Sequence, residues 1–170
     1  MTRLIERGAP NADALFASET RHDTTANGRR SAFVAAAGRS SAATKAQYFD
    51  KYFRDTTLNE DWATASLRAF NTADQSALTL PYLVPALDSL PWIQKNRRIF
   101  FLGSWLGGFI GGHKSPEALL EIDNFLSQRQ SLPADIRLKI LQTRDDLERT
   151  VRIRAKYAGS GAATSTQLRH

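Results

Sequence analysis

The sequence contains no cysteine among its 170 residues. This absence excludes disulfide bonds and thiolate metal sites, because both require a cysteine sulfur. The longest apolar stretch, residues 99–112, is too short for a membrane-spanning helix, which needs about 20 residues. The first residues, MTRLIERGAPNADAL, lack the apolar centre of a signal peptide. The sequence does not assign a compartment, and a soluble, cytoplasmic protein is the favoured expectation.

The sequence also lacks the short motifs that carry hydrolytic chemistry. It contains neither H-E-x-x-H nor G-x-S-x-G. Its histidines, His22, His113 and His170, share no metal-ligand spacing with one another or with a carboxylate. We therefore assign no catalytic, metal-binding or cofactor-binding residue, and the residues alone indicate that this chain is not a complete enzyme.

Acidic residues are clearly outnumbered only in the second half of the chain. Residues 80–170 carry 13 basic and 8 acidic groups, whereas residues 1–79 carry 10 and 9. Part of the excess lies in RTVRIRAKY, residues 149–157, which has no stacking aromatic residue except Tyr157 and follows three acidic residues. We expect an exposed helix with Asp145–Arg149 and Glu148–Arg152 pairs, and nucleic-acid binding is the less favoured interpretation.

No segment alternates polar and apolar residues over the length of a strand, and the spacing of apolar residues predicts one helix after another. Predicted N-caps are Asp23, Ser41, Asn59 and Ser115. A stripe of aromatic residues at helical spacing is predicted to be core: Tyr48, Phe49, Tyr52 and Phe53.

The longest predicted helix follows Pro133 and ends near Tyr157. One apolar stripe consists of Ile136, Ile140, Leu147 and Val151, and a second of Thr150, Ile153 and Tyr157. The small, polar residues 158–170 are expected to form a disordered tail.

The stretch GSWLGGFIGGHKSPEALLE, residues 103–121, resembles a phosphate-binding loop, G-x-x-x-x-G-K-[S/T]. His113 separates Gly112 from Lys114, and this extra residue breaks the required spacing. The preceding apolar residues are spaced as one helix face, so we predict a helix–turn–helix corner. Gly103, Gly107 and Gly111 recur every four residues, which predicts a closely packed neighbour on their face.

Several stretches occur in the same order as in a known family. They are LTLPYLVPALDSLPWIQKNRRIFFLGSWL, then SPEALLEIDNFL, then LPADIRLKILQTRDDLERTVRIRAKY, preceded by DTTANGRR, the Lys45-to-Phe53 helix and LNEDW. Over roughly residues 10–157 the chain resembles the C-terminal helical domain of the aminopeptidase N family of zinc metallopeptidases.

This resemblance implies an all-α fold over residues 1–157, with antiparallel helix pairs stacked as a short α-solenoid of the HEAT or armadillo kind. The implied role is non-catalytic: the domain stabilises the enzyme and walls the peptide cavity, while the parent enzyme removes N-terminal residues from peptides. The implied partners are the catalytic domain, in the same or a split polypeptide, and the peptide substrate. Arg149 and Arg152 are candidate contacts for a peptide carboxylate.

The family's H-E-x-x-H motif with a distant glutamate, and its G-x-M-E-N motif, lie in an earlier domain and are absent here. Zinc is therefore expected only in the parent enzyme and not in this chain. We also expect the chain to lack the first helices of the solenoid, and so to expose an apolar face at its beginning. The alternative is a free-standing helical scaffold that binds a protein partner.

Overall fold

The computed structural model describes residues 2–55 and 57–164, with side chains up to Tyr157. The described residues contain helices, turns and loops but no strand, which confirms the all-α prediction. The α-helices are α1 (Thr2–Glu6), α2 (Ala12–His22), α3 (Ala26–Ala37), α4 (Ala42–Arg54), α5 (Glu60–Phe70), α6 (Ser76–Thr79), α7 (Leu83–Asp88), α8 (Leu90–Asn96), α9 (Phe101–Phe109), α10 (Pro116–Gln128) and α11 (Ala134–Thr164). Short 3-10 turns, Ala73–Gln75 and Leu80–Tyr82, flank α6.

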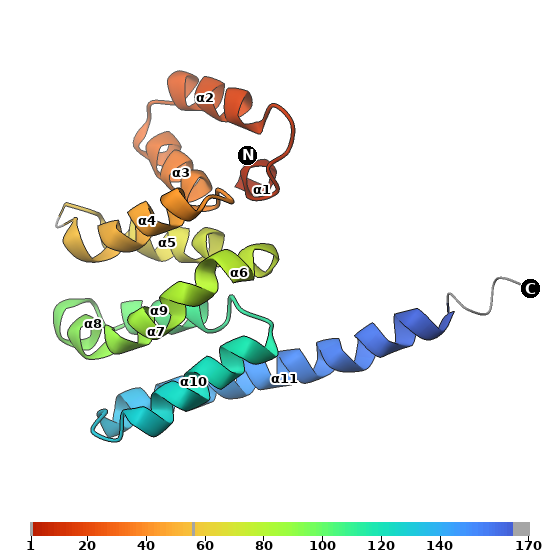
Figure 1. Cartoon of the computed structure of the whole chain (residues 1–170). Helices are drawn as coiled ribbons and strands as arrows, with labels where there is room; N and C mark the ends of the chain where they lie inside the picture. Colours follow the sequence, from red (N-terminus) through yellow and green to blue (C-terminus); the bar gives the residue numbers. More distant parts are fainter. Residues whose placement is uncertain (1, 56, 165–170) are drawn as a thin grey trace, which may run out of the picture.

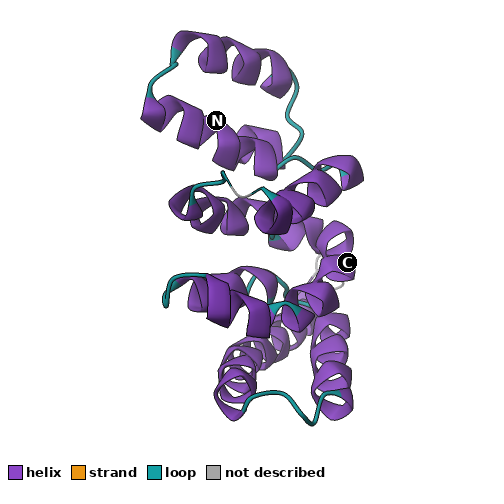
Figure 2. Cartoon of the chain, turned by 90° about the vertical axis from the view of Figure 1, so that its left-hand side faces the viewer, coloured by secondary structure: helices purple, strands orange, loops and turns teal. Residues whose placement is uncertain are grey.

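The helices stack in chain order as a helical-repeat fold (Figures 1 and 2). On one side of the stack α3 packs on α5, α5 on α9, and α9 on α11. On the other side α4 contacts α6, and α7 contacts α10, which also packs along α11. Among the described residues, no helix combines the length and the apolar character that crossing a membrane requires.

Three of the four predicted N-caps are confirmed. Ser41 Oγ accepts a hydrogen bond from the N–H of Thr44, and Asn59 Oδ1 accepts one from the N–H of Asp61. Ser115 Oγ accepts from the third residue of α10, and Pro116 occupies the first helical position, where its missing N–H has no consequence.

The fourth prediction, Asp23, is wrong. Thr25 caps α3 instead, and its Oγ1 accepts from the N–H of Gly28 at 3.1 Å. Asp23 Oδ1 accepts from the N–H of Thr25 at 3.1 Å, which is the two-residue reach typical of an aspartate before a turn. Aspartate and threonine are both good caps, and here the aspartate fixes the turn that places the threonine.

The last helix differs from its predicted length. Its backbone is helical through Thr164, beyond the end predicted near Tyr157. No proline interrupts this segment, although it contains Gly159 and Gly161, which are weak helix formers. The predicted disordered tail therefore overlaps the helix over residues 158–164, and its remainder, residues 165–170, lies outside the described residues.

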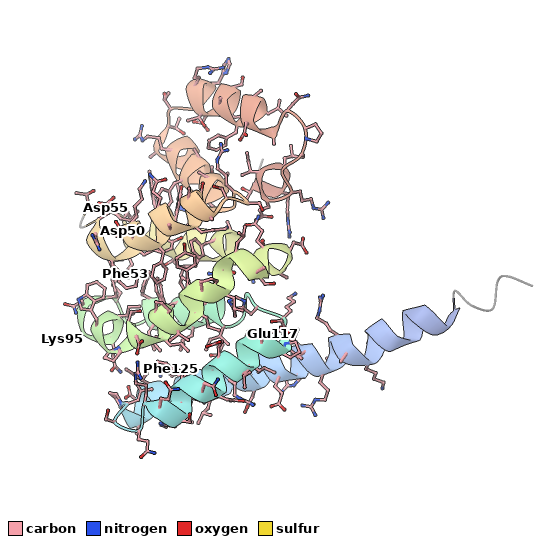
Figure 3. The ribbon with its side chains drawn as sticks, in the orientation of Figure 1. Asp50, Phe53, Asp55, Lys95, Glu117 and Phe125 are labelled. Carbon is pink, nitrogen blue, oxygen red and sulfur yellow. The ribbon has the colours of Figure 1, made fainter. Side chains whose placement is uncertain are left out.

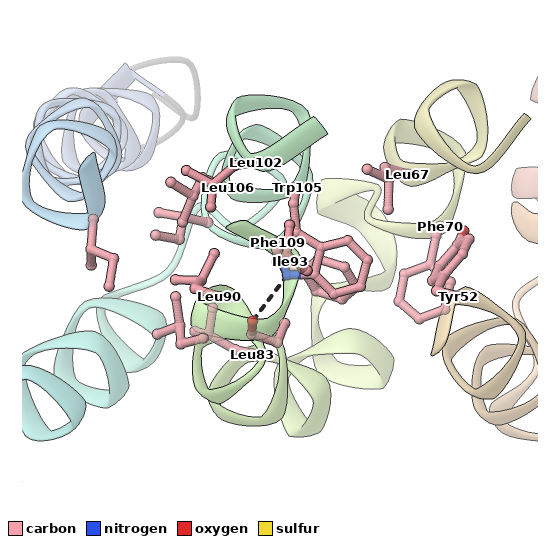
Figure 4. Packing of buried hydrophobic residues seen from close by; sticks show 14 of the residues in the cluster. Tyr52, Leu67, Phe70, Leu83, Leu90, Ile93, Leu102, Trp105, Leu106 and Phe109 are labelled. Carbon is pink, nitrogen blue, oxygen red and sulfur yellow. Dashed lines mark hydrogen bonds between the residues drawn. The ribbon is translucent and has the colours of Figure 1, made fainter. Parts of the chain in front are cut away.

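The core lies between the two sides of the stack and is rich in aromatic rings (Figure 4). Trp105 is buried, and its Nε1–H donates to the carbonyl oxygen of Ala86 at 2.9 Å. Tyr48 and Tyr52 are buried, and Phe49 and Phe53 pack partly buried against the same cluster. The predicted core role of this stripe is confirmed.

The glycine-rich stretch forms the predicted corner, in which α9 ends at Phe109 and α10 begins at Pro116. However, the prediction chose the wrong glycines. A Cβ at Gly103 or Gly107 would meet nothing within 4 Å, whereas a Cβ at Gly112 would lie 2.5 Å from the Cβ of Asn71. A Cβ at Gly108 would similarly meet Leu67 of α5. The covered face therefore contains Gly108 and Gly112, one residue further along the chain than the predicted Gly107 and Gly111. Periodicity locates a small-residue face only approximately, and the neighbouring helix decides which face is covered.

Candidate functional site

Both candidate peptide contacts lie in the second half of α11, which extends beyond the stack (Figure 1). Arg149 is exposed, and its Nη1 lies 3.7 Å from Asp146 Oδ1 of the same helix. Arg152 is also exposed and forms no ion pair with the part of the chain that the structure describes. Their charges are therefore available to an anionic group outside this chain.

The two ion pairs predicted for α11 are replaced by a cluster around Arg144. Its Nη1 lies 2.6 Å from Glu148 Oε2 and 3.7 Å from Asp145 Oδ1. Its Nε and Nη2 donate to the two carboxylate oxygens of Asp123 on α10, at 2.7 and 2.9 Å. These hydrogen bonds lower the pKa of Asp123 and raise that of Arg144. Asp123 on α10 holds the Arg144 guanidinium in place. Arg144 therefore pairs with Asp145 and Glu148, the acidic residues that the sequence spacing had assigned to Arg149 and Arg152.

A buried lysine, which sequence analysis missed, joins the C-terminal ends of two helices. Lys45 is 0% exposed, and its Nζ donates to the carbonyl oxygens of Ala37 in α3 and Phe70 in α5, at 2.9 and 2.7 Å. Burial lowers the pKa of Lys45 to about 8, so the amine still carries its charge at neutral pH. Lys45 precedes Tyr48 and Tyr52 by three and seven residues, a spacing that places it on the buried face of α4.

A lysine with a lowered pKa is a recognised nucleophile for carbonyl substrates. Lys45 does not fit that role, because it is fully buried and donates to two main-chain carbonyl oxygens. The negative ends of α3 and α5 meet at this ammonium group, which neutralises both. In this arrangement Lys45 locks the first layer of the stack, formed by α1, α2 and α3, to the second layer, formed by α4 and α5.

A second buried polar group lies where α9 turns toward α10. His113 is 1% exposed, and neither ring nitrogen has a hydrogen-bond partner. Burial lowers its pKa to about 4, so the imidazole is neutral at pH 7. Neutral imidazole is a good metal ligand, but the described residues hold no group of three histidine or carboxylate side chains that could bind a metal ion.

The first layer of the stack contains a hollow of about 280 Å³ between α2 and α3. Its lining includes the apolar side chains of Phe16, Ala32 and Ala35 and the acidic side chains of Glu19 and Asp23. Leu4 and Leu15, on α1 and α2, are also exposed. This apolar surface lies at the opposite end of the stack from α11, so it does not include Arg149 or Arg152 (Figure 1).

Most charged side chains that Figure 3 shows lie on the outside of the stack, while Phe53 and Phe125 point toward neighbouring helices.

A comparison with protein-family models finds no match, and a comparison with curated proteins finds no matching sequence. Two of the exposed surfaces are residues 149–157 of α11, which carry three arginines and one lysine, and the open first layer.

Proposed function

We propose that this chain is the non-catalytic helical domain of a zinc aminopeptidase. In this proposal it stabilises the enzyme and walls the cavity that holds the peptide, and the parent enzyme removes N-terminal residues. Support comes from the ordered resemblance over roughly residues 10–157 and from the stacked helices, which are the implied architecture. Such stacks present extended surfaces and depend on neighbours to cover their ends.

The observation that carries the proposal is the open first layer. Leu4 and Leu15 are 41% and 48% exposed, and Phe16 lines a hollow between α2 and α3. Apolar side chains and a hollow at one end of a helical stack suit a surface that another domain covers. In the proposed enzyme the covering part is the catalytic domain or the helices that connect to it.

The contribution of this chain to catalysis is then mechanical and electrostatic. The zinc of the parent enzyme activates a water molecule in another domain. Here the rigid stack excludes water and limits the space for the peptide, while the guanidinium groups of Arg149 and Arg152 attract its terminal carboxylate. An Arg side chain suits this task, because its planar group can donate two parallel hydrogen bonds to a carboxylate.

The test is to isolate the native protein from its source with an antibody against exposed residues of α10. We expect a polypeptide several times larger than 18.9 kDa that releases the fluorophore from aminoacyl-coumarin substrates. A chelator should abolish this activity, and added zinc should restore it. An isolated protein of 18.9 kDa without bound catalytic subunit or peptidase activity would overturn the proposal.

The role of the two arginines is tested separately in the parent enzyme with Arg149→Ala and Arg152→Ala. We expect a higher KM for peptides with a free C-terminal carboxylate and an unchanged KM for aminoacyl-coumarins, which lack that group. Arg21→Ala, at an exposed position of α2, is the matched control. Equal KM values for all variants and both substrates would remove the arginines from the proposal and leave the structural role intact.

One observation favours the alternative, a free-standing scaffold for a protein partner. Ile99 and Phe100 are each 85% exposed at the turn between α8 and α9. The turn is held rigidly, because Arg97 Nη2 donates to the carbonyl oxygen of Tyr52 and the N–H of Arg98 donates to Glu60. A native 18.9-kDa polypeptide that co-purifies with a non-peptidase protein, and loses it on Phe100→Asp, would favour this alternative.

A further inference from the structure

The second half of α11 carries a stripe that the described helices leave largely uncovered, although Thr143 and Thr150 within it are half-buried. Ile153 is 51% and Tyr157 66% exposed, and every residue from Arg152 to Tyr157 is exposed. The stripe consists of positions spaced alternately by three and four residues, namely Thr143, Asp146, Thr150, Ile153 and Tyr157. This spacing places them on one face of the helix, on which Ile153 and Tyr157 are the large apolar side chains.

The stack occupies a different face of α11. Ile136, Ile140 and Leu147 are buried, and α11 contacts α9 and α10. Helical segments without tertiary contacts are marginal in water, because most helix stability in proteins comes from packing. A helix that continues past its last buried residue therefore indicates a further neighbour along the uncovered stripe.

The second half of α11 is complementary to itself when a second copy runs antiparallel, with the two Thr150 side chains at the centre. Asp146 of each copy then faces Arg154 of the other, and Thr143 faces Tyr157. Ile153 lies level with Leu147 of the other copy, beside the edge of its stack. The same surface serves both copies, as a two-fold symmetric interface requires.

We propose that this protein forms a symmetric dimer through residues 143–157 of α11, paired antiparallel about Thr150. The charges are available for this pairing. Asp146 is 75% exposed, and its contact with Arg149 at 3.7 Å is too long for a strong hydrogen bond. Arg154 is exposed and forms no ion pair with the part of the chain that the structure describes. The interface is short, so the dimer should dissociate on dilution. This inference does not depend on the proposed aminopeptidase role.

The first test measures molar mass by light scattering after size exclusion, over a range of protein concentrations. The full chain should rise from 18.9 kDa toward twice that value as concentration increases. Asp146→Arg and Arg154→Asp should each hold the mass at 18.9 kDa, and the double variant should restore the dimer. Circular dichroism serves to confirm that each variant keeps its helix content.

The second test uses the absence of native cysteine. Thr150→Cys should give a covalent dimer under mild oxidation, because the two-fold axis places the two sulfurs together. Leu138→Cys, exposed elsewhere on α11, should not. An equimolar mixture of Thr143→Cys and Tyr157→Cys should cross-link in the antiparallel arrangement, whereas Tyr157→Cys alone should not.

Three results would overturn the proposal. The first is a wild-type chain that stays at 18.9 kDa at every concentration, and the second is a dimer that both single charge reversals leave intact. The third is efficient cross-linking of Tyr157→Cys alone, which indicates parallel helices. Restoration of the dimer by the double reversal, together with Thr150→Cys cross-linking, supports it.

Discussion

The ammonium group of Lys45 lies 2.7 Å from the carbonyl oxygen of Phe70 and 5.0 Å from the centre of its ring. One residue of α5 therefore provides both a hydrogen-bond acceptor and a π surface to a buried cation from α4. With the bond to Ala37, this contact ties three helices together. The Lys45 side chain has no exposed surface, so loss of its charge should weaken the first half of the stack.

We predict that Lys45→Met lowers the free energy of unfolding by about 3 kcal/mol, because it leaves two buried carbonyl oxygens without their donor. Urea unfolding followed by circular dichroism measures this change. Lys95→Met, at an exposed position of α8, should leave the midpoint unchanged. Equal midpoints for the two variants would show that Lys45 does not lock the layers.

The close approach of Gly112, just after α9, to Asn71, just after α5, predicts opposite effects for two glycine substitutions. Gly112→Ala should destabilise by about 1–3 kcal/mol, because its Cβ would overlap Asn71. Gly103→Ala should stabilise by up to about 1 kcal/mol, because its position is open and alanine favours the helix. Thermal unfolding of both variants checks the prediction, which fails if the two shifts have the same sign.

His113 predicts a specific loss of stability in acid. Burial lowers its pKa from 6.5 in the unfolded chain to about 4 in the folded protein. Between these values the unfolded chain binds more protons, so stability falls as pH drops from 6.5 to 4. The shift corresponds to about 3 kcal/mol, at about 1.4 kcal/mol per pKa unit.

The measurement is the free energy of unfolding against pH for the wild type and for His113→Leu. The variant should lose less stability over this range, while His22→Gln, at an exposed position, should follow the wild type. Parallel curves for the wild type and His113→Leu would show that the imidazole is accommodated when charged.

The bidentate contact between Arg144 and Asp123 predicts an energetic coupling between α10 and α11. A double-mutant cycle with Arg144→Met and Asp123→Asn should give about 1 kcal/mol, a modest value because the Asp123 side chain is 48% exposed. The coupling should decrease at high salt. A coupling near zero at low salt would assign the pairing of these helices to apolar packing alone.

The sequence by itself determined the all-helical class and the starts of α4, α5 and α10. Ser41, Asn59 and Ser115 cap their helices through bonds to backbone groups two or three residues away, and such short-range bonds are legible in sequence. The aromatic stripe of α4 is core for a similar reason, since its spacing fixes one face of the helix. The cap at Thr25 was missed because two good caps lie two residues apart and compete.

Only the tertiary structure decided which surfaces meet. The contact of Gly112 with Asn71, and the burial of Lys45 and His113, depend on residues from other helices. Arg144 takes the acidic partners assigned to Arg149 and Arg152, because Asp123 on a different helix holds it in place. Local bonds set where each helix begins, whereas the pairing of groups distant in sequence depends on how the helices stack, and a helical period alone does not specify that stacking.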